Sequence, residues 1–438
     1  MYQFSVPHLE SAFRLDIDQV VITGQATVQQ GDRQALVFEV RLAEPGWWCR
    51  SCGCQGKPRG SRSRLLTHAP NGSRPVRLLL RLRCFTCALC QTYWSEQVPV
   101  NLAASGSKLT RAAINWALVS VVLDGLSINA VARNLGTAWN TVNDAVLEAG
   151  YTHLISDPTR FDGVTTIGVD EHCWRHVGWR SDRFVTVIID LTPRSDGRPA
   201  RLLDMIPGRS KQVLASWLKG QATQFRLNVK TVAMDGFTGY KSAVREVLKS
   251  ATTVMDPFHV VRLVGDKVTQ CRQRLQQETL GRRGRKNDPL YQARRLLLTR
   301  NKLLSETAAP KVDAILQDPQ YEALTRLWTI YQAVIAAYES PNRKKGRNNL
   351  AALIDALGAI NTKGFPELRS VARTLRNRRD DILAYFTHPH SSNGPTEAIN
   401  GRLEHLRGIA LGFRNLQNYI HRSLLHTGGF KNNLQPLL

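Results

Sequence analysis

Six of the eight cysteines are crowded between residues 49 and 90, where they form two Cys-x-x-Cys pairs and two single cysteines. Two such pairs on opposed hairpin turns can bring four thiolates around a Zn²⁺ ion, and four thiolates leave no open position for water. The sequence therefore predicts a structural zinc site. We expect its ligands to be Cys49, Cys52, Cys87 and Cys90. Cys54 and Cys84 are the competing ligands, and a disulfide framework is not expected in a long intracellular chain.

The charge balance indicates a polyanionic partner. The 438 residues include 59 Lys and Arg against 35 Asp and Glu, a formal net charge of +24. Each phosphate that a Lys or Arg neutralises releases counterions, so a surface this basic favours nucleic acid. No apolar run approaches the roughly 20 residues that span a bilayer. No apolar leader follows Met1. We therefore expect a cytoplasmic protein without membrane association.

Residues 1 to about 45 alternate apolar and polar side chains, a pattern typical of short strands. We expect strands near residues 20–22, 36–40 and 76–83. A Gly/Ser/Arg-rich loop is expected between Cys54 and the last of these strands. Residues 1–104 are thus the predicted zinc-binding N-terminal domain.

Residues 105–160 change to a helical period. We expect helices over 112–123 and 128–135 and a third from residue 137 or 138. Helix, glycine-containing turn and helix is the helix-turn-helix pattern, and an ordinary three-helix unit is the alternative. The basic composition and the adjacent zinc module favour DNA binding. In that interpretation Trp139, Asn140 and Asn143 face the groove or the phosphates.

The remaining residues predict a mixed sheet that is interrupted by a helical segment. Residues 161–265 alternate buried strands with helices, as in a sheet flanked by helices. Residues 266–388 are almost entirely helical. A basic run in this segment is either a solvated loop or a phosphate contact. Its candidate DNA contacts are Arg282, Arg283, Arg285 and Lys286. A last helix begins near residue 393, within the segment 389–438.

Three carboxylates stand at positions that suit phosphodiester chemistry. Asp170 and Asp235 each end a predicted strand, and Glu397 lies in the first turn of the last helix. Carboxylate oxygens can hold two Mg²⁺ ions about 4 Å apart, one at the attacking oxygen and one at the leaving oxygen. The alternative is that each Asp is a turn or cap residue. Glu171 points away if its strand continues, and Glu404 competes with Glu397 as a ligand.

Five short motifs together resemble the ISL3 family of insertion-sequence transposases. In order they are Ile167-Gly-Val-Asp170-Glu-His172, Ala233-Met-Asp235-Gly-Phe237, Asp256-Pro-Phe-His259, Asn393-Gly-Pro-Thr-Glu397-Ala-Ile-Asn400 and Gly412-Phe-Arg414-Asn-Leu-Gln-Asn-Tyr419. With the cysteine pairs and the three helices, the resemblance covers nearly the whole chain. It implies an RNase H-like catalytic core with a DDE triad, and recognition of terminal inverted repeats by the N-terminal modules.

The resemblance also implies roles for single residues. Asp170, Asp235 and Glu397 become ligands of Mg²⁺ or Mn²⁺, and His259 becomes an active-site neighbour. Asn393 and Asn400 flank the glutamate, where capping and packing are at least as good an interpretation as contact with substrate.

We therefore predict a multidomain α/β protein, a bacterial DDE transposase associated with the nucleoid. Its predicted parts are a zinc-binding N-terminal domain (1–104), a helix-turn-helix domain (105–160), an RNase H-like core (161–265 and 389–438) and a helical insertion (266–388). We expect it to act on double-stranded DNA, both element ends and target, as a homodimer or higher oligomer. The alternatives are a non-catalytic zinc and helix-turn-helix DNA-binding protein derived from a transposase, and a plain nuclease with the same core.

Overall fold

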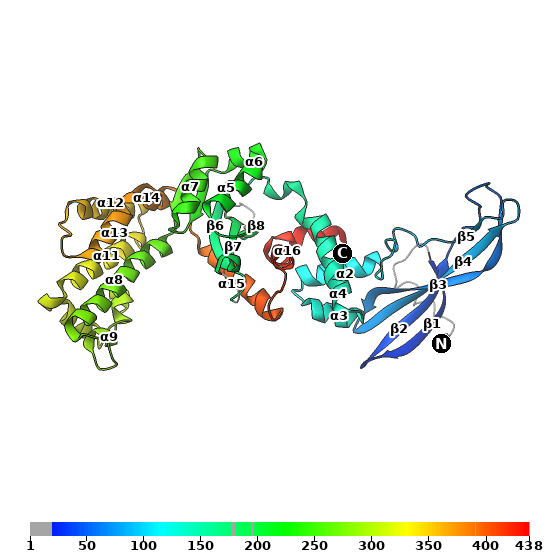
Figure 1. Cartoon of the computed structure of the whole chain (residues 1–438), viewed down its shortest axis with the longest axis horizontal. Helices are drawn as coiled ribbons and strands as arrows, with labels where there is room; N and C mark the ends of the chain where they lie inside the picture. Colours follow the sequence, from blue (N-terminus) through cyan, green and yellow to red (C-terminus); the bar gives the residue numbers. More distant parts are fainter. Residues whose placement is uncertain (1–19, 177–179, 194–196, 390, 438) are drawn as a thin grey trace. The chain divides into compact units, whose positions relative to one another are not determined.

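The chain forms two compact units, each of which combines strands with helices. The computed structural model describes residues 20–176, 180–193, 197–389 and 391–437. Unit 1 comprises residues 1–160 and 404–438, and unit 2 comprises residues 161–403. The mixed α/β class that we predict is thereby confirmed (Figure 1). In the described ranges, no helix has the length and apolar character needed to cross a bilayer.

Unit 1 begins with one sheet. Its strands are β1 (Val20–Gln30), β2 (Arg33–Leu42), β3 (Gly56–Asn71), β4 (Arg74–Cys87) and β5 (Tyr93–Ser95). They lie in the order β1-β2-β4-β3, with β5 also beside β4. β2 and β4 are parallel, and the other neighbours are antiparallel. Alternate residues of β4, among them Leu78, Leu80 and Leu82, are buried and pack against Val40 and Leu66.

Strand β3 corrects our prediction of a Gly/Ser/Arg-rich loop before β4. It pairs with β4 from Gly56 to Asn71, with two interruptions of the register. It is an edge strand, where prolines are tolerated, and both interruptions of the register lie next to a proline, Pro58 or Pro70. Residues 57–63 are exposed on both faces. The alternation of apolar and polar residues that marks a half-buried strand is therefore missing from this part of the sequence.

Helices complete unit 1. They are α2 (Arg111–Val122), α3 (Ile128–Leu135), α4 (Trp139–Gly150) and α16 (Leu416–Thr427). Ser127 caps α3, and Gly136 ends it in the left-handed region at φ 60°. Leu425 packs into the core formed by α2, α3 and α4, and a Cβ on Gly150 would lie 2.7 Å from it. The segment 389–438, which we predict as one part of the catalytic core, is thus divided between the two units.

Unit 2 contains a second sheet. Its strands are β6 (Thr166–Cys173), β7 (Phe184–Asp190), β8 (Arg201–Pro207), β9 (Thr231–Met234) and β10 (Thr252–Met255). Their order is β10-β9-β6-β7-β8. β6, β7 and β8 form an antiparallel meander, and β9 and β10 run parallel to β6. Helices α5 (Lys211–Gly220), α6 (Thr223–Asn228) and α7 (Thr238–Val247) follow β8 and β9. Leu214 and Tyr240 of these helices pack on Ile167, Val169 and Ile188.

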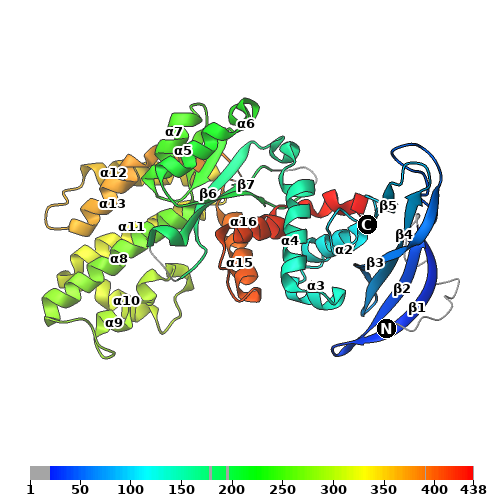
Figure 2. The same cartoon turned by 45° about the vertical axis from the view of Figure 1, so that its right-hand side comes forward.

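The rest of unit 2 is helical. The helices are α8 (Pro257–Leu280), α9 (Pro289–Gln292), α10 (Ala309–Leu316), α11 (Glu322–Tyr338), α12 (Arg343–Ala359), α13 (Pro366–Asn377), α14 (Arg379–Thr387) and the part of α15 (Gly394–Ile409) up to Leu403. α8 and α11 lie side by side (Figure 2). Their core includes Met255 at the end of β10, so this helical part is continuous with the sheet.

Candidate active site and metal centre

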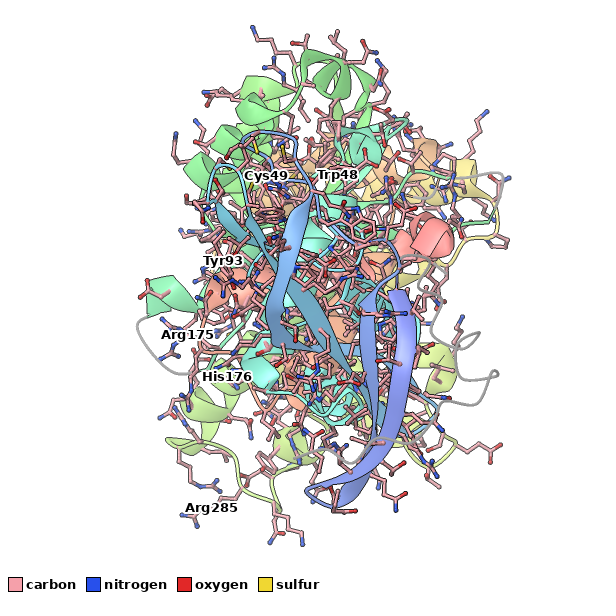
Figure 3. The ribbon with its side chains drawn as sticks, turned by 90° about the vertical axis from the view of Figure 1, so that its right-hand side faces the viewer. Trp48, Cys49, Tyr93, Arg175, His176 and Arg285 are labelled. Carbon is pink, nitrogen blue, oxygen red and sulfur yellow. The ribbon has the colours of Figure 1, made fainter. Side chains whose placement is uncertain are left out.

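Four thiols converge where β3 begins and β4 ends. Cys49 and Cys52 precede β3, and Cys87 and Cys90 lie at and after the end of β4. Their sulfur atoms all lie within 4.8 Å of one another, and the Cys49–Cys90 and Cys52–Cys87 pairs are 3.4 Å apart. Sulfurs about 2.3 Å from a tetrahedral zinc ion would be separated by about 3.8 Å. The cluster therefore fits a zinc ion in both spacing and donor chemistry. Figure 3 shows Cys49 next to Trp48 at this end of the sheet.

Two similar turns hold these thiols. The N–H of Gly53 donates to the carbonyl of Cys49 at 2.9 Å, and the N–H of Gln91 donates to the carbonyl of Cys87 at 3.1 Å. Gly53 and Gln91 have positive φ angles of 74° and 57°. A left-handed residue after each Cys-x-x-Cys pair turns the chain back, which points both thiols of each pair to the same side.

The two competing cysteines lie outside this group. Cys54 is exposed after the first turn. Cys84 is buried within β4, and its thiol lies 4.0 Å from the carbonyl oxygen of Leu82. Neither belongs to the group of four whose sulfur atoms are close enough to share one ion.

The two aspartates of the predicted triad are brought side by side by strand pairing. β6 and β9 are parallel neighbours, and their register pairs Val169 with Met234. Asp170 is the next residue of β6, and Asp235 is the residue that follows β9. The two carboxylates therefore come from equivalent positions at the same edge of the sheet.

The aspartates share a partly buried, negatively charged environment. Asp170 is 9% exposed. Burial and, to a lesser extent, the charge of Asp235 raise the pKa of Asp170 to about 6, against hydrogen bonding from the Glu171 N–H and the charge of His259. Burial also raises the pKa of Asp235, while His259 and Arg378 oppose that rise. The structure thus brings the predicted histidine, in the first turn of α8, to both aspartates.

Helix α15 contacts this site through Asn400. The Asn400 amide donates to the Asp170 carboxylate at 3.0 Å. The close approach of helix and strand depends on Gly168 of β6. A Cβ there would lie 2.8 Å from the Thr396 hydroxyl and 3.0 Å from the Asn393 side-chain oxygen. The structure therefore places Asn400 in contact with the candidate active site.

Asp256 links the start of α8 to the start of α15. Its carboxylate accepts from the N–H of Phe258 at 3.0 Å and from the N–H of Asn393 at 2.6 Å. Asp256 is 2% exposed. Because both helix starts are held by one carboxylate, Asp256 fixes the segments that carry His259 and Glu397. Asp256 is part of a family motif in the sequence, but that motif assigned it no role.

Glu397 is exposed on the first turn of α15. In the ranges that the structure describes, only the four cysteines form a group of three or more potential ligands within metal-binding distance. The three carboxylates of the predicted triad are thus not gathered into such a group. The structure brings Asp170, Asp235 and His259 together and adds Asn400, one turn after Glu397.

Two other acidic residues that we weighed have partners of their own. Glu171 accepts a salt bridge from Arg209 at 2.9 Å. Glu404 forms an ion pair with Arg407 in α15. These ion pairs agree with leaving both residues out of the triad.

A buried ionic cluster beside Asp235 was missed by the sequence reasoning. Arg378 donates to the Asp235 carbonyl at 3.4 Å and pairs with Asp381 at 2.8 Å. Lys241 pairs with the same carboxylate of Asp381 at 2.5 Å. Arg378 is 6% exposed. The charged run at 376–381 was its only signal, and such a run is usually a solvated helix face.

The candidate DNA contacts of α4 differ in exposure. Trp139 is 47% exposed, and Asn140 next to it is exposed too. Asn143 is 4% exposed, and its amide donates to the Asp144 carboxylate at 3.2 Å. Only the first two therefore present their side chains to solvent.

The basic run after α8 forms an exposed loop. Arg283, Arg285 and Lys286 are exposed, and Figure 3 shows the Arg285 side chain pointing away from the ribbon. Arg282 is instead paired with Asp288 at 2.7 Å. Three of the four predicted cations are thus open to a phosphate.

Comparison with known proteins identifies the relatives of this chain. A family model described as Transposase, DDE_Tnp_ISL3, matches residues 167–423, more than half of the chain. Two curated relatives are each named "Transposase for insertion sequence element IS1557", from Mycobacterium tuberculosis strains CDC 1551 / Oshkosh and ATCC 25618 / H37Rv. Each is 25% identical over 326 residues, which cover 70% of this chain and 69% of the relative. The chain therefore belongs to the ISL3 family of insertion-sequence transposases.

Proposed function

We propose that this chain binds the terminal inverted repeats of an insertion sequence and catalyses the cleavage and joining of DNA ends. Membership of a transposase family implies DNA binding and nucleic-acid processing. The observation that carries the catalytic part is the parallel register of β6 and β9, which puts Asp170 beside Asp235. The contact from Asn400 adds α15, the helix of Glu397, to the same sheet edge.

The topology of unit 2 supports an RNase H-like core. Numbered along the chain, its strands lie in the order 3-2-1-4-5, with a three-stranded meander followed by two parallel strands. The helices from α8 to α14 stand between the last strand and α15, where a helical insertion of the core is expected.

Asp170, Asp235 and Glu397 are the residues proposed to hold Mg²⁺ or Mn²⁺. Carboxylate oxygens suit these ions. Burial, and to a lesser extent the charge of Asp235, raise the pKa of Asp170 by penalising its ionised form, and a bound cation would offset that penalty. When bound, the ions activate the attacking oxygen and stabilise the leaving oxygen of the phosphodiester. Asn400 orients the Asp170 carboxylate by its hydrogen bond. His259 places a further polar group beside both aspartates.

Unit 1 is the proposed DNA-reading part. α3, the turn at Gly136 and α4 form a helix-turn-helix in this proposal, with Trp139 and Asn140 at the exposed start of the second helix. Backbone N–H groups at a helix start also favour phosphate. The four-cysteine cluster holds a structural zinc ion that fixes the end of the sheet. Two element ends must be cut and joined together, so the active form is a homodimer or higher oligomer.

The test is strand transfer of labelled element-end DNA with Mg²⁺ or Mn²⁺. Asp235→Asn is expected to lose joining and keep end binding, because it removes one charge from an intact fold. Glu171→Gln is the matched control, since Glu171 is a neighbouring carboxylate paired with Arg209. Joining by Asp235→Asn at the wild-type rate would refute the triad. A wild type that binds ends but neither cuts nor joins with either metal would support the non-catalytic alternative.

A further inference from the structure

A hollow of about 450 Å³ opens beside Glu397 in unit 2. Its walls come from the start of α8, from α11, from α14 and from the start of α15. The lining includes Phe258, Tyr331, Tyr338, Tyr385, Arg300 and Glu397. The volume lies within the range of about 300–1,000 Å³ that is usual for small-molecule sites. The hollow can hold one planar group and is too small for a duplex.

The walls of the hollow are aromatic. Tyr338 is stacked on Phe386 with ring centres 5.3 Å apart and meets Tyr385 edge-on at 5.5 Å. Phe258 is 52% exposed, although a phenylalanine gains from burial. It lies directly before His259 and meets that ring edge-on at 5.5 Å. An exposed aromatic ring at the rim therefore stands next to the candidate active site.

One polar group in the hollow has no partner. The hydroxyl oxygen of Tyr338 is buried and makes no hydrogen bond within the described ranges. The hydroxyl of Tyr331, by contrast, donates to the Leu298 carbonyl at 2.9 Å. A buried polar atom without a partner is costly. The Tyr338 hydroxyl is thus placed to meet a hydrogen-bonding group of a ligand.

The charged groups at the hollow also limit its ligand. Arg300 and Lys302 are both paired with Glu339, at 2.5 and 2.6 Å. Glu397 brings a carboxylate that is exposed. The lining also includes the Asp256 carboxylate and is acidic in balance. A planar, neutral group with polar edges suits aromatic walls, a free hydroxyl and an acidic lining better than an anion does.

We propose that this hollow receives a single unpaired nucleobase from the DNA end that is cut at the neighbouring carboxylates. The inference rests on the proposed function, because the base must arrive with a DNA end held at Asp170 and Asp235. Enzymes that do chemistry on a base take that base out of the stack into a pocket, where it stacks between aromatic or apolar side chains and its edge is hydrogen-bonded. The same contacts can hold a base next to a phosphodiester that is cut. Here Phe258 stacks on the base, and the Tyr338 hydroxyl bonds to its edge. The helical part of unit 2 then contributes directly to end recognition.

The test compares the affinity of the full chain for element ends that carry either a mismatched base or an abasic site at the same position. Each position around the cleavage site is scanned without added Mg²⁺ or Mn²⁺. Wild type is expected to prefer the mismatched base about tenfold at one position, in line with base–aromatic stacking. Phe258→Ala and Tyr338→Phe should reduce that preference, the first by removing stacking and the second by removing only a hydroxyl.

Tyr291→Ala is the matched control, because Tyr291 is an aromatic of the same helical part that stacks with Arg294 outside the hollow. It should keep the preference. A wild type that joins ends but shows no preference at any position would overturn the inference and leave the proposed function intact. Equal loss in Phe258→Ala and Tyr291→Ala would also overturn it. A wild type that does not bind element ends at all would defeat both proposals.

Discussion

The two candidate metal sites are built in opposite ways. Cys49 and Cys90 are 41 residues apart and meet at 3.4 Å through two turns of one hairpin region. Asp170 and Asn400 are 230 residues apart and meet only after strands have paired and α15 has packed on β6. Thiols can be neutral and gather without repulsion, whereas carboxylates repel one another. A structural ion site can therefore be closed by local chain geometry, while a catalytic one stays open until metal and substrate offset its charge.

Removing one ligand from the thiol cluster should have the largest effect of the changes at the two sites. We expect Cys87→Ser to lose zinc and to weaken end binding by more than about 100-fold, because structural zinc contributes roughly 10–16 kcal/mol to small zinc domains. Zinc content per chain and hydrogen exchange around β3 and β4 measure the effect. Cys54→Ser is the control and should keep both zinc and binding. Equal zinc loss in the two variants would mean that the ligand set is wrong.

Removing a carboxylate from the candidate active site should stabilise the folded state, whereas removing a thiol from the zinc site should destabilise it. The pKa of Asp170 is raised to about 6 from its usual 3.8. Ionisation of Asp170 therefore destabilises the folded state increasingly from pH 3.8 to about pH 6, and by a constant amount at higher pH. Asp170→Asn should therefore stabilise the metal-free active site by roughly 1–3 kcal/mol at pH 7.5 while abolishing joining.

The sign of this effect is checked by its pH dependence. A raised pKa means that the folded state binds the proton more tightly than the unfolded state. The gain in Asp170→Asn should grow between pH 4 and pH 6 and stay constant above. Unfolding free energies of variant and wild type at each matched pH give this difference. A gain that is independent of pH would exclude the charge of Asp170 as its cause.

The contact between α15 and β6 can be probed at Gly168. Gly168→Ala should cost about 1–3 kcal/mol, as other overpacked core sites do. Its Cβ would lie 2.8 Å from the Thr396 hydroxyl and 2.9 Å from Leu191. Strand transfer should fall about 100-fold, because displaced catalytic groups cost rate steeply. Gly220→Ala is the control, since nothing lies within 4 Å of a Cβ at Gly220. Full joining activity in Gly168→Ala would show that this contact does not position the site.

The smallest effect is expected at the exposed basic loop. Arg285→Ala together with Lys286→Ala should reduce the slope of log affinity against log salt by about two, roughly one for each phosphate contact. Arg282→Ala should change the slope less, since Arg282 is paired with Asp288. Titrations at several salt concentrations measure these slopes. Equal slopes for the double variant and wild type would identify the run as a solvated loop.

Local patterns in the sequence predicted most of the elements but not their long-range contacts. The strand that contains Asp170 and the two cysteine pairs carry signals within a few residues, and the structure contains both. The predicted end of the strand at Asp170 is wrong, because β6 continues to Cys173 in its pairing with β7. The cluster of Lys241, Arg378 and Asp381 joins residues about 140 apart, and no periodicity reports such a pairing. Asn143 shows that the same limit applies to a single helix. Its place on α4 could be predicted, but its burial depends on which face of α4 is covered by α16 and the neighbouring helices.

The strand β3 failed as a sequence prediction for a different reason. Strand patterns are visible only where one face is buried, and residues 57–63 have no buried face. The exposed position of Glu397 could not be anticipated either, since the family motif places the residue on a helix but does not fix its side chain.

The division of the C-terminal segment has a consequence for synthesis on the ribosome. Residues 391–403 complete unit 2, and residues from 404 onward, including Leu425, complete the helical core of unit 1. Unit 2 therefore cannot finish its core before residue 403 has been translated, and unit 1 cannot finish its core until the segment that contains Leu425 has followed. A polypeptide released before residue 397 lacks both Glu397 and the packing of Leu425 that supports α4. Such a fragment is not expected to occupy element ends and block them, so incomplete translation would yield inert chains rather than inhibitors.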